Sequence, residues 1–249
     1  MGWIGRRAAG AVSVALRACP AVGGSAPGRY YDDPRQVEVL TAAERGDLDG
    51  VRRLAAAGVD LGGVSNTHDS RRSELPLLLF AVEFTGPKAV TTMLRAGADP
   101  LQQSEGGYNA AAYAILREKP RSLRALLDFD PELVESPDRL GGNVLHTAVL
   151  HGNRQAIDLL LGRGVDVNTR ATVSRETPLF GAATLRRIDI CMTLLRAGAD
   201  ASLRDVHGGT FLHPLFVNDD GILTADFTRR RSRLVNELRR RGFPVETGR

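Results

Sequence analysis

Few residues of this chain have the type and spacing that catalysis or metal binding requires. The histidines are scattered, and no His-Glu-x-x-His pair occurs among them; they are His68, His146, His151, His207 and His213. Only Cys19 and Cys191 occur as cysteines, which excludes a cysteine-rich zinc site or a disulfide framework. No phosphate-binding glycine loop and no Gly-x-Ser-x-Gly elbow is present. The sequence therefore predicts no enzyme, metal, cofactor or small-molecule substrate.

The composition is that of an ordinary globular protein built from small helices. Hydrophobic residues make up 43% of the 249 residues and charged residues 25%, whereas aromatic residues make up only 5%. So few aromatic residues disfavour a sheet sandwich and favour an all-α fold. The net charge of +4 is modest and does not by itself indicate nucleic-acid binding.

Four similar helix endings recur along the sequence. Each follows an apolar helical run and reads Gly-x-Asp, with the glycine at Gly58, Gly97, Gly164 or Gly198. Glycine is favoured just past a helix because it enters the left-handed backbone region without a Cβ clash. Gly164 and Gly198 are 34 residues apart, and Gly97 precedes Gly164 by 67 residues, which indicates one degenerate unit between them.

A second recurrent element opens the helical runs. It is clearest in Asn143–Ala148, Thr177–Ala182 and Thr210–Leu215. In the second of these, Thr177 places a capping hydroxyl before a proline in the first helical turn. With its Gly-x-Asp endings the pattern resembles the ankyrin repeat. The resemblance implies an ankyrin-repeat solenoid of about six helix-turn-helix units, with short β-hairpin fingers between units at Asp138–Gly141 and Asp205–Gly208.

The predicted organisation has three parts. Residues 1–35 form a leader and tether, residues 36–245 the ankyrin-repeat domain, and residues 246–249 a tail. In the repeats, Cys191 is expected to be a small buried residue. The resemblance implies that His146 and His213 form hydrogen bonds between units.

Partner-binding residues are expected where the repeat pattern leaves positions unused, at the fingers and on the first helices. Arginine is favoured at interfaces because its planar guanidinium pairs with carboxylates and stacks on rings. The alternative for each residue is that its side chain only keeps the protein surface soluble. The candidates are Arg139, His151, Arg170, Arg175, Arg186, Arg187, Arg204 and His207.

The C-terminal segment combines an apolar stripe at Leu234, Val235 and Leu238 with seven arginines between Arg229 and Arg241. One interpretation is a polar cap on the last repeat. The other is a basic patch for an acidic protein or nucleic acid, and no aromatic residue between the arginines offers a platform for base stacking.

The first residues have the order of an export signal. Arg6 and Arg7 precede the apolar segment 8–16, and Leu16-Arg17-Ala18-Cys19 resembles the lipobox of bacterial lipoproteins, from which Arg17 departs. A working signal would place the protein in the cell envelope or periplasm, with membrane contact only through a lipid on Cys19. The alternative is a disordered leader on a cytoplasmic protein.

Three functions remain open. The first is a monomeric bacterial binding module that holds an acidic protein surface against its concave face, including an envelope-located immunity or inhibitor protein. The second is a cytoplasmic regulator that docks onto one cellular enzyme. The third, a hydrolase hidden in the repeats, would need a convergent polar pocket.

Overall fold

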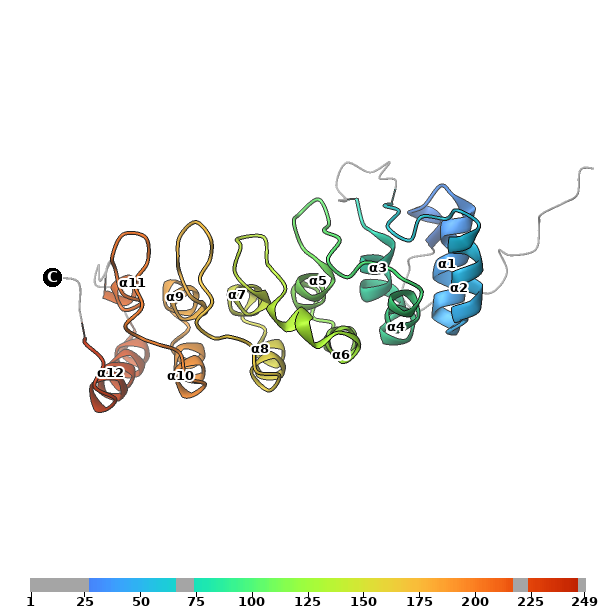
Figure 1. Cartoon of the computed structure of the whole chain (residues 1–249). Helices are drawn as coiled ribbons and strands as arrows, with labels where there is room; N and C mark the ends of the chain where they lie inside the picture. Colours follow the sequence, from blue (N-terminus) through green and yellow to red (C-terminus); the bar gives the residue numbers. More distant parts are fainter. Residues whose placement is uncertain (1–26, 66–73, 217–223, 246–249) are drawn as a thin grey trace, which may run out of the picture.

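The structure is a computed structural model that describes residues 27–65, 74–216 and 224–245. Within these residues the helices fall into six consecutive pairs, stacked side by side in one elongated array (Figure 1). The first helices are α1 (Pro34–Arg45), α3 (Leu77–Phe80) continued by the π-helical η2 (Ala81–Thr85), α5 (Ala110–Leu116), α7 (Val144–His151), α9 (Pro178–Thr184) and α11 (His213–Phe216). The second helices are α2 (Leu48–Ala56), α4 (Pro87–Arg95), α6 (Pro120–Phe129), α8 (Arg154–Leu161), α10 (Ile188–Arg196) and α12 (Ala225–Arg240).

Stacking of neighbouring pairs creates one continuous apolar core. First helices pack on first helices from α3 to α11, and second helices pack on second helices in the pairs α4–α6, α6–α8 and α10–α12. Figure 1 shows both rows, with the fingers projecting beyond the first helices. The core side chains come from every pair, so no pair buries its apolar face alone.

Glycine ends the second helices as the sequence predicts. Gly58, Gly97, Gly164 and Gly198 all have positive φ angles, between 78° and 102°, and their N–H groups bond back into the preceding helix. The predicted capping by threonine is wrong in detail. Thr177 occupies the N-cap of α9 and Pro178 begins the helix, but the Thr177 side chain makes no capping hydrogen bond.

The fingers are tight turns with a single bridge at the base rather than extended strands. Pro137 pairs with Asn143, and Arg204 pairs with Thr210. In the first of these fingers Asp138 Oδ1 accepts hydrogen bonds from the N–H groups of Leu140 and Gly142. Asp205 does the same for His207 and Gly209. The Asp-x-x-Gly signal therefore locates these turns correctly.

The packed domain begins earlier than residue 36. Before α1 lies a short 3-10 turn, η1 (Pro27–Arg29), and Tyr31 behind it is 3% exposed. The Tyr31 hydroxyl donates to the carbonyl of Leu75 at 2.8 Å, and its ring meets Phe80 edge to face. Residues 27–35, which the sequence assigns to the leader and tether, therefore include part of the packed domain. Cys19 and the rest of the predicted signal lie outside the described residues.

The apolar stripe of the C-terminal segment is confirmed. Leu234, Val235 and Leu238 of α12 are buried, and most of the arginines around them are exposed. Arg231 instead lies against the Phe216 ring, with its guanidinium carbon 4.5 Å from the ring centroid. Its Nη1 donates to the carbonyl of Leu215 at 3.0 Å, so this arginine joins α12 to α11.

Candidate partner-binding surface

The predicted binding residues occupy two sets of positions. Those of the fingers are Arg139, Arg170, Arg175, Arg204 and His207, and those at the ends of first helices are His151, Arg186 and Arg187. Several of them have structural contacts of their own, so the expectation that the fold leaves all of these positions unused is wrong for part of the set.

Arg170 joins two fingers. Its Nε donates to the carbonyl oxygen of Arg175 at 3.1 Å, and its Nη2 donates to the carbonyl oxygen of Arg204 in the next finger. Arg204 in turn donates to the Gly208 carbonyl at 2.7 Å. These guanidinium groups therefore satisfy backbone acceptors in and between the fingers.

Arg187 closes the end of the neighbouring first helix. Its Nη1 donates to the carbonyls of Val149 and Leu150 in the last turn of α7, and the Val149 carbonyl also accepts from the N–H of Gly152. A cation at a helix C-terminus also interacts favourably with the helix dipole. The pKa of His151, the last residue of α7, is lowered first by burial and second by the nearby Arg187 charge.

His146 behaves as the family resemblance implies. One ring nitrogen lies 3.2 Å from the Asn143 side chain, and the other lies 3.2 Å from the carbonyl of Glu176 in the next unit. Cys191 is fully buried, and burial raises the pKa of its thiol to about 12. The exposed His213 makes no such contact within the described residues.

Arg175 and Arg186 are held in the left-handed backbone region, with φ angles of 57° and 54°. Comparable turns of other units place glycine there, as at Gly141 in a finger and Gly152 between two helices. A side chain in this region is strained by about 1 kcal/mol or more. The Arg175 side chain is exposed and has no hydrogen-bond or ionic partner in the described part of the chain.

Sequence reasoning missed the apolar part of this surface. Three successive fingertips expose a large apolar side chain, Leu140 (52% exposed), Val173 (84%) and Val206 (54%). We call these three residues, together with Arg139, Arg175 and His207, the fingertip row. The Thr172 N–H donates to the Leu140 carbonyl, and the Val206 N–H donates to the Ser174 carbonyl, so backbone hydrogen bonds join the three fingertips.

Leucines add to the positions at the helix ends. Leu150 (43% exposed) precedes His151, and Leu185 (39% exposed) precedes Arg186. Both leucines stand at first-helix positions that the repeat pattern leaves free in the sequence. The three fingertip residues carry no such signal, because hydrophobic periodicity marks core positions and not single apolar residues in turns.

A second polar cluster joins the second and third units. Glu83 of the π-helical turn η2 has a side chain only 9% exposed, and it accepts hydrogen bonds from the Tyr113 hydroxyl and the Arg117 guanidinium. Burial and the adjacent Glu83 carboxylate raise the pKa of Tyr113. Because these groups satisfy one another, the cluster is a link between repeats.

The described residues contain no cluster of metal-ligating side chains. Groups of three or more histidine, cysteine, aspartate or glutamate side chains arranged to hold a metal are absent there. None of the described helices combines the length and the apolar run that crossing a membrane requires.

Comparison with known proteins agrees with the repeats. The model for ankyrin repeats (3 copies) matches residues 78–171 and 137–205. Protein PhlB of Serratia liquefaciens is 39% identical over 41% of this chain and 44% of its own length, and human B-cell lymphoma 3 protein is 30% identical over 75% of this chain and 48% of its own. The chain thus spans less than half the length of either relative.

Among solved structures, the ankyrin repeat domain of Bcl-3, titled a unique member of the IkappaB protein family, superimposes with a TM-score of 0.65. It is 28% identical in sequence, and the match covers 83% of this chain and 86% of that domain. The stacked helix pairs, the finger turns and the family match lead to one conclusion. This chain belongs to the ankyrin-repeat family, a family of typically non-enzymatic proteins that mediate protein–protein interaction.

Proposed function

We propose that this protein is a monomeric, non-catalytic binding module that holds a partner protein against its fingertip row. The observation that carries the proposal is the row itself, in which three joined fingertips each present an exposed apolar side chain close to a basic one. Protein interfaces combine a desolvated apolar centre with arginine anchors, and the row offers both kinds of side chain.

The chemistry of the row favours an acidic partner surface. Arg139 and Arg175 supply permanent positive charge. Arg139 also lies 5.7 Å from the Tyr108 ring centroid, which orients its guanidinium. The backbone strain at Arg175 supports a role outside the fold, because glycine would occupy the same turn without strain.

The experiment first identifies the partner through the surface. A photo-crosslinking amino acid replaces Val173, and a control protein carries it at the exposed Asp158 of α8. We expect one discrete adduct from position 173 and none from position 158. Adducts from position 158 alone would place the partner on the second helices and refute the proposed surface.

The second step measures affinity by calorimetry with the purified partner. Arg175→Gly should weaken binding by about 2 kcal/mol, because it removes a central guanidinium. It should leave the free energy of unfolding unchanged or raise it by up to about 1 kcal/mol, because it relieves the strained φ angle. Glu118→Gly is the matched control, since Glu118 has a φ of 53° and carries the opposite charge.

A narrower form of the proposal is an immunity or inhibitor protein in the bacterial cell envelope, anchored by a lipid on Cys19. The support is the order of residues 6–19, in which two arginines, an apolar segment and Leu16-Arg17-Ala18-Cys19 follow one another. Mass spectrometry of the mature protein after cell fractionation tests it. A chain that begins at a lipidated Cys19 in the envelope is expected, whereas an intact amino-terminal methionine in the cytoplasm would favour a regulator of a cellular enzyme.

A further inference from the structure

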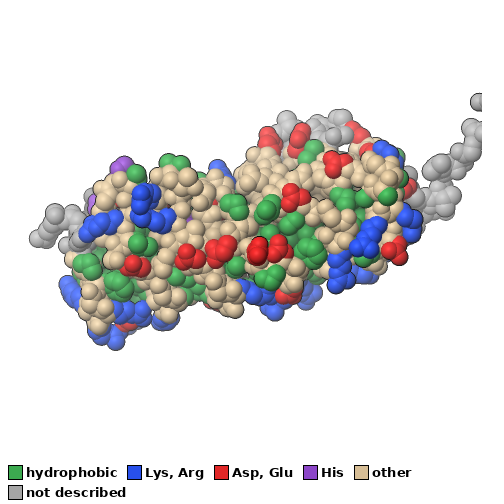
Figure 2. Space-filling model, in the orientation of Figure 1, with side chains coloured by type: hydrophobic (Ala, Val, Ile, Leu, Met, Phe, Trp, Pro, Cys, Tyr) green, Lys and Arg blue, Asp and Glu red, His purple; other side chains and the backbone are tan. Residues whose placement is uncertain are grey.

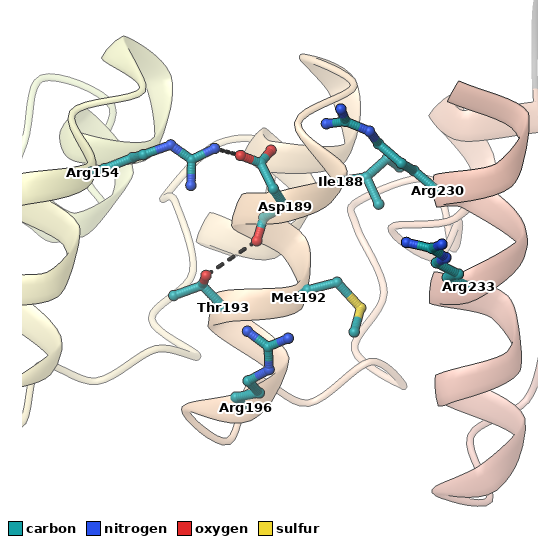
Figure 3. A pocket seen from close by; sticks show the side chains of 8 residues that line it. All are labelled: Arg154, Ile188, Asp189, Met192, Thr193, Arg196, Arg230 and Arg233. Atoms are coloured by element: carbon teal, nitrogen blue, oxygen red, sulfur yellow. Dashed lines mark hydrogen bonds and ion pairs between the residues drawn. The ribbon is translucent and has the colours of Figure 1, made fainter. Parts of the chain in front are cut away.

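A groove on the second helices near the C-terminal end lies apart from the fingers. It runs between α10 and α12 and has a volume of about 350 Å³. Arg230 and Arg233 reach from α12 toward α10, and Arg196 faces the same space from the end of α10 (Figure 3). The volume is at the low end of ligand pockets, which suits one short segment rather than an extended chain.

The α10 wall of the groove combines an apolar patch with the polar side chains of Asp189, Thr193 and Arg196. Ile188 and Met192 form the apolar patch, and Met192 is only partly buried against the core. Methionine is flexible and polarisable, so it adapts to side chains of different shape. The groove can therefore take an apolar side chain of a binding partner.

The rim of the groove is strongly basic, and two of its arginines have no ionic partner. Arg154 pairs with Asp189 at one side, and Arg230 Nε lies 2.7 Å from the Asp226 carboxylate. The side chains of Arg196 and Arg233 form no hydrogen bond or ion pair with any other residue of the described chain. Two exposed guanidinium groups beside an apolar patch offer paired sites for carboxylates.

We propose that this groove binds an acidic segment of a partner protein, with an apolar side chain against Met192 and carboxylates on Arg196 and Arg233. Charge complementarity identifies the occupant as acidic. The apolar patch favours a peptide over a single-stranded nucleic acid, for which the residues lining the groove offer no aromatic stacking platform. At the C-terminal end of the array, Figure 2 shows basic side chains near the fingers and near the second helices. Acidic side chains lie between these two groups on the face shown. The groove is thus a docking site distinct from the fingertip row.

Fluorescence anisotropy on the full chain tests the proposal. The probe is the labelled peptide Asp-Glu-Leu-Asp-Glu-Leu-Asp, and a second probe carries serine in place of leucine. The double variant Arg196→Ala/Arg233→Ala should weaken binding of the leucine probe by more than about tenfold, equivalent to losing at least one anchoring contact. The serine probe should bind the unmodified protein several times more weakly, because the apolar patch is then left without a contact.

The matched control is Arg121→Ala/Arg239→Ala, which removes the same charge from exposed positions outside the groove. It should change affinity less than about twofold, and Arg175→Gly should leave it unchanged, so a failure of the fingertip proposal stays separate from a failure of this one. Equal weakening by both double variants would overturn the groove as the site. Absence of peptide binding, or tighter binding to single-stranded DNA or phosphatidylserine vesicles, would overturn the acidic segment as its ligand.

Discussion

At the scale of single residues, arginines with the same sequence pattern have different roles. The Arg187 guanidinium donates hydrogen bonds to carbonyls in the last turn of α7, and the Arg170 guanidinium donates to carbonyls of two fingers. Arg175 instead extends from a strained turn into solvent. A buried or half-buried carbonyl needs a donor, so substituting Arg187 affects the fold as well as any interface. Binding studies of this protein therefore need stability measurements for each arginine variant.

The pKa of His151 depends in part on the position of the Arg187 charge. Burial and, secondarily, the Arg187 charge lower its pKa, so the folded protein binds a proton less readily at this site than the unfolded chain. The site's contribution to the free energy of unfolding therefore falls as the pH drops from the ordinary histidine pKa of about 6.5 toward the lowered folded pKa. Titration of the His151 ring by NMR should give a pKa below 6.5.

The variant Arg187→Gln separates the two causes. It removes the charge and should move the pKa of His151 up toward its ordinary value, while Arg196→Gln, in the groove between α10 and α12, should leave it unchanged. An identical pKa in the unmodified protein and in Arg187→Gln would show that burial alone causes the shift.

At the scale of elements, the helix pairs and their turns could be predicted because their signals are local. Glycine endings, apolar spacing and Asp-x-x-Gly fingers depend on residues within a few positions of one another, as at Gly164 or Asp138. Contacts between units depend on residues about 30 to 45 positions apart, such as Arg187 with Val149 or Tyr31 with Leu75. No local pattern specifies these contacts, which is why the start of the domain and the roles of the arginines were missed.

The last finger contains a buried hydroxyl that can be tested directly. Thr210 is 3% exposed, and its Oγ1 has no hydrogen-bond partner among the described residues. A buried polar atom without a partner lowers stability by about 1–3 kcal/mol relative to an apolar group of the same shape. Thr210→Val should therefore raise the free energy of unfolding by about 1 kcal/mol in urea denaturation.

Thr147 provides the comparison. It is equally buried, but its hydroxyl lies 3.5 Å from the Asp138 carboxylate that shapes a finger. Thr147→Val should lower the free energy of unfolding by about 1 kcal/mol. If Thr210→Val also lowers the free energy of unfolding, the Thr210 hydroxyl forms a hydrogen bond in solution.

At the scale of the whole molecule, each helix pair packs chiefly on its neighbours. Stability should then be a sum of unit and interface contributions. Ile115 of α5 and Ile190 of α10 are both buried and are separated by the α7–α8 pair. Ile115→Val and Ile190→Val should each lower the free energy of unfolding by about 1 kcal/mol, and the double variant should equal their sum within about 0.5 kcal/mol.

Denaturation of the three variants and the unmodified protein gives this comparison. If the loss of stability in the double variant differs from the sum of the two single losses by more than about 1 kcal/mol, distant units are coupled. That result would contradict an array held together by neighbour contacts alone.

The link that Arg170 makes between two fingers also affects the affinity with which a partner can bind. Fingers joined through Arg170 and through the backbone bond between Val206 and Ser174 have already lost much of their independent motion before any encounter. A partner that binds these joined fingers has fewer loop motions to restrict than a partner that binds separate loops. The entropy cost of ordering the fingers on binding is therefore smaller. The fingertips therefore offer a stiff, ready-made template, and a partner whose shape does not fit that template is discriminated against by its mismatch.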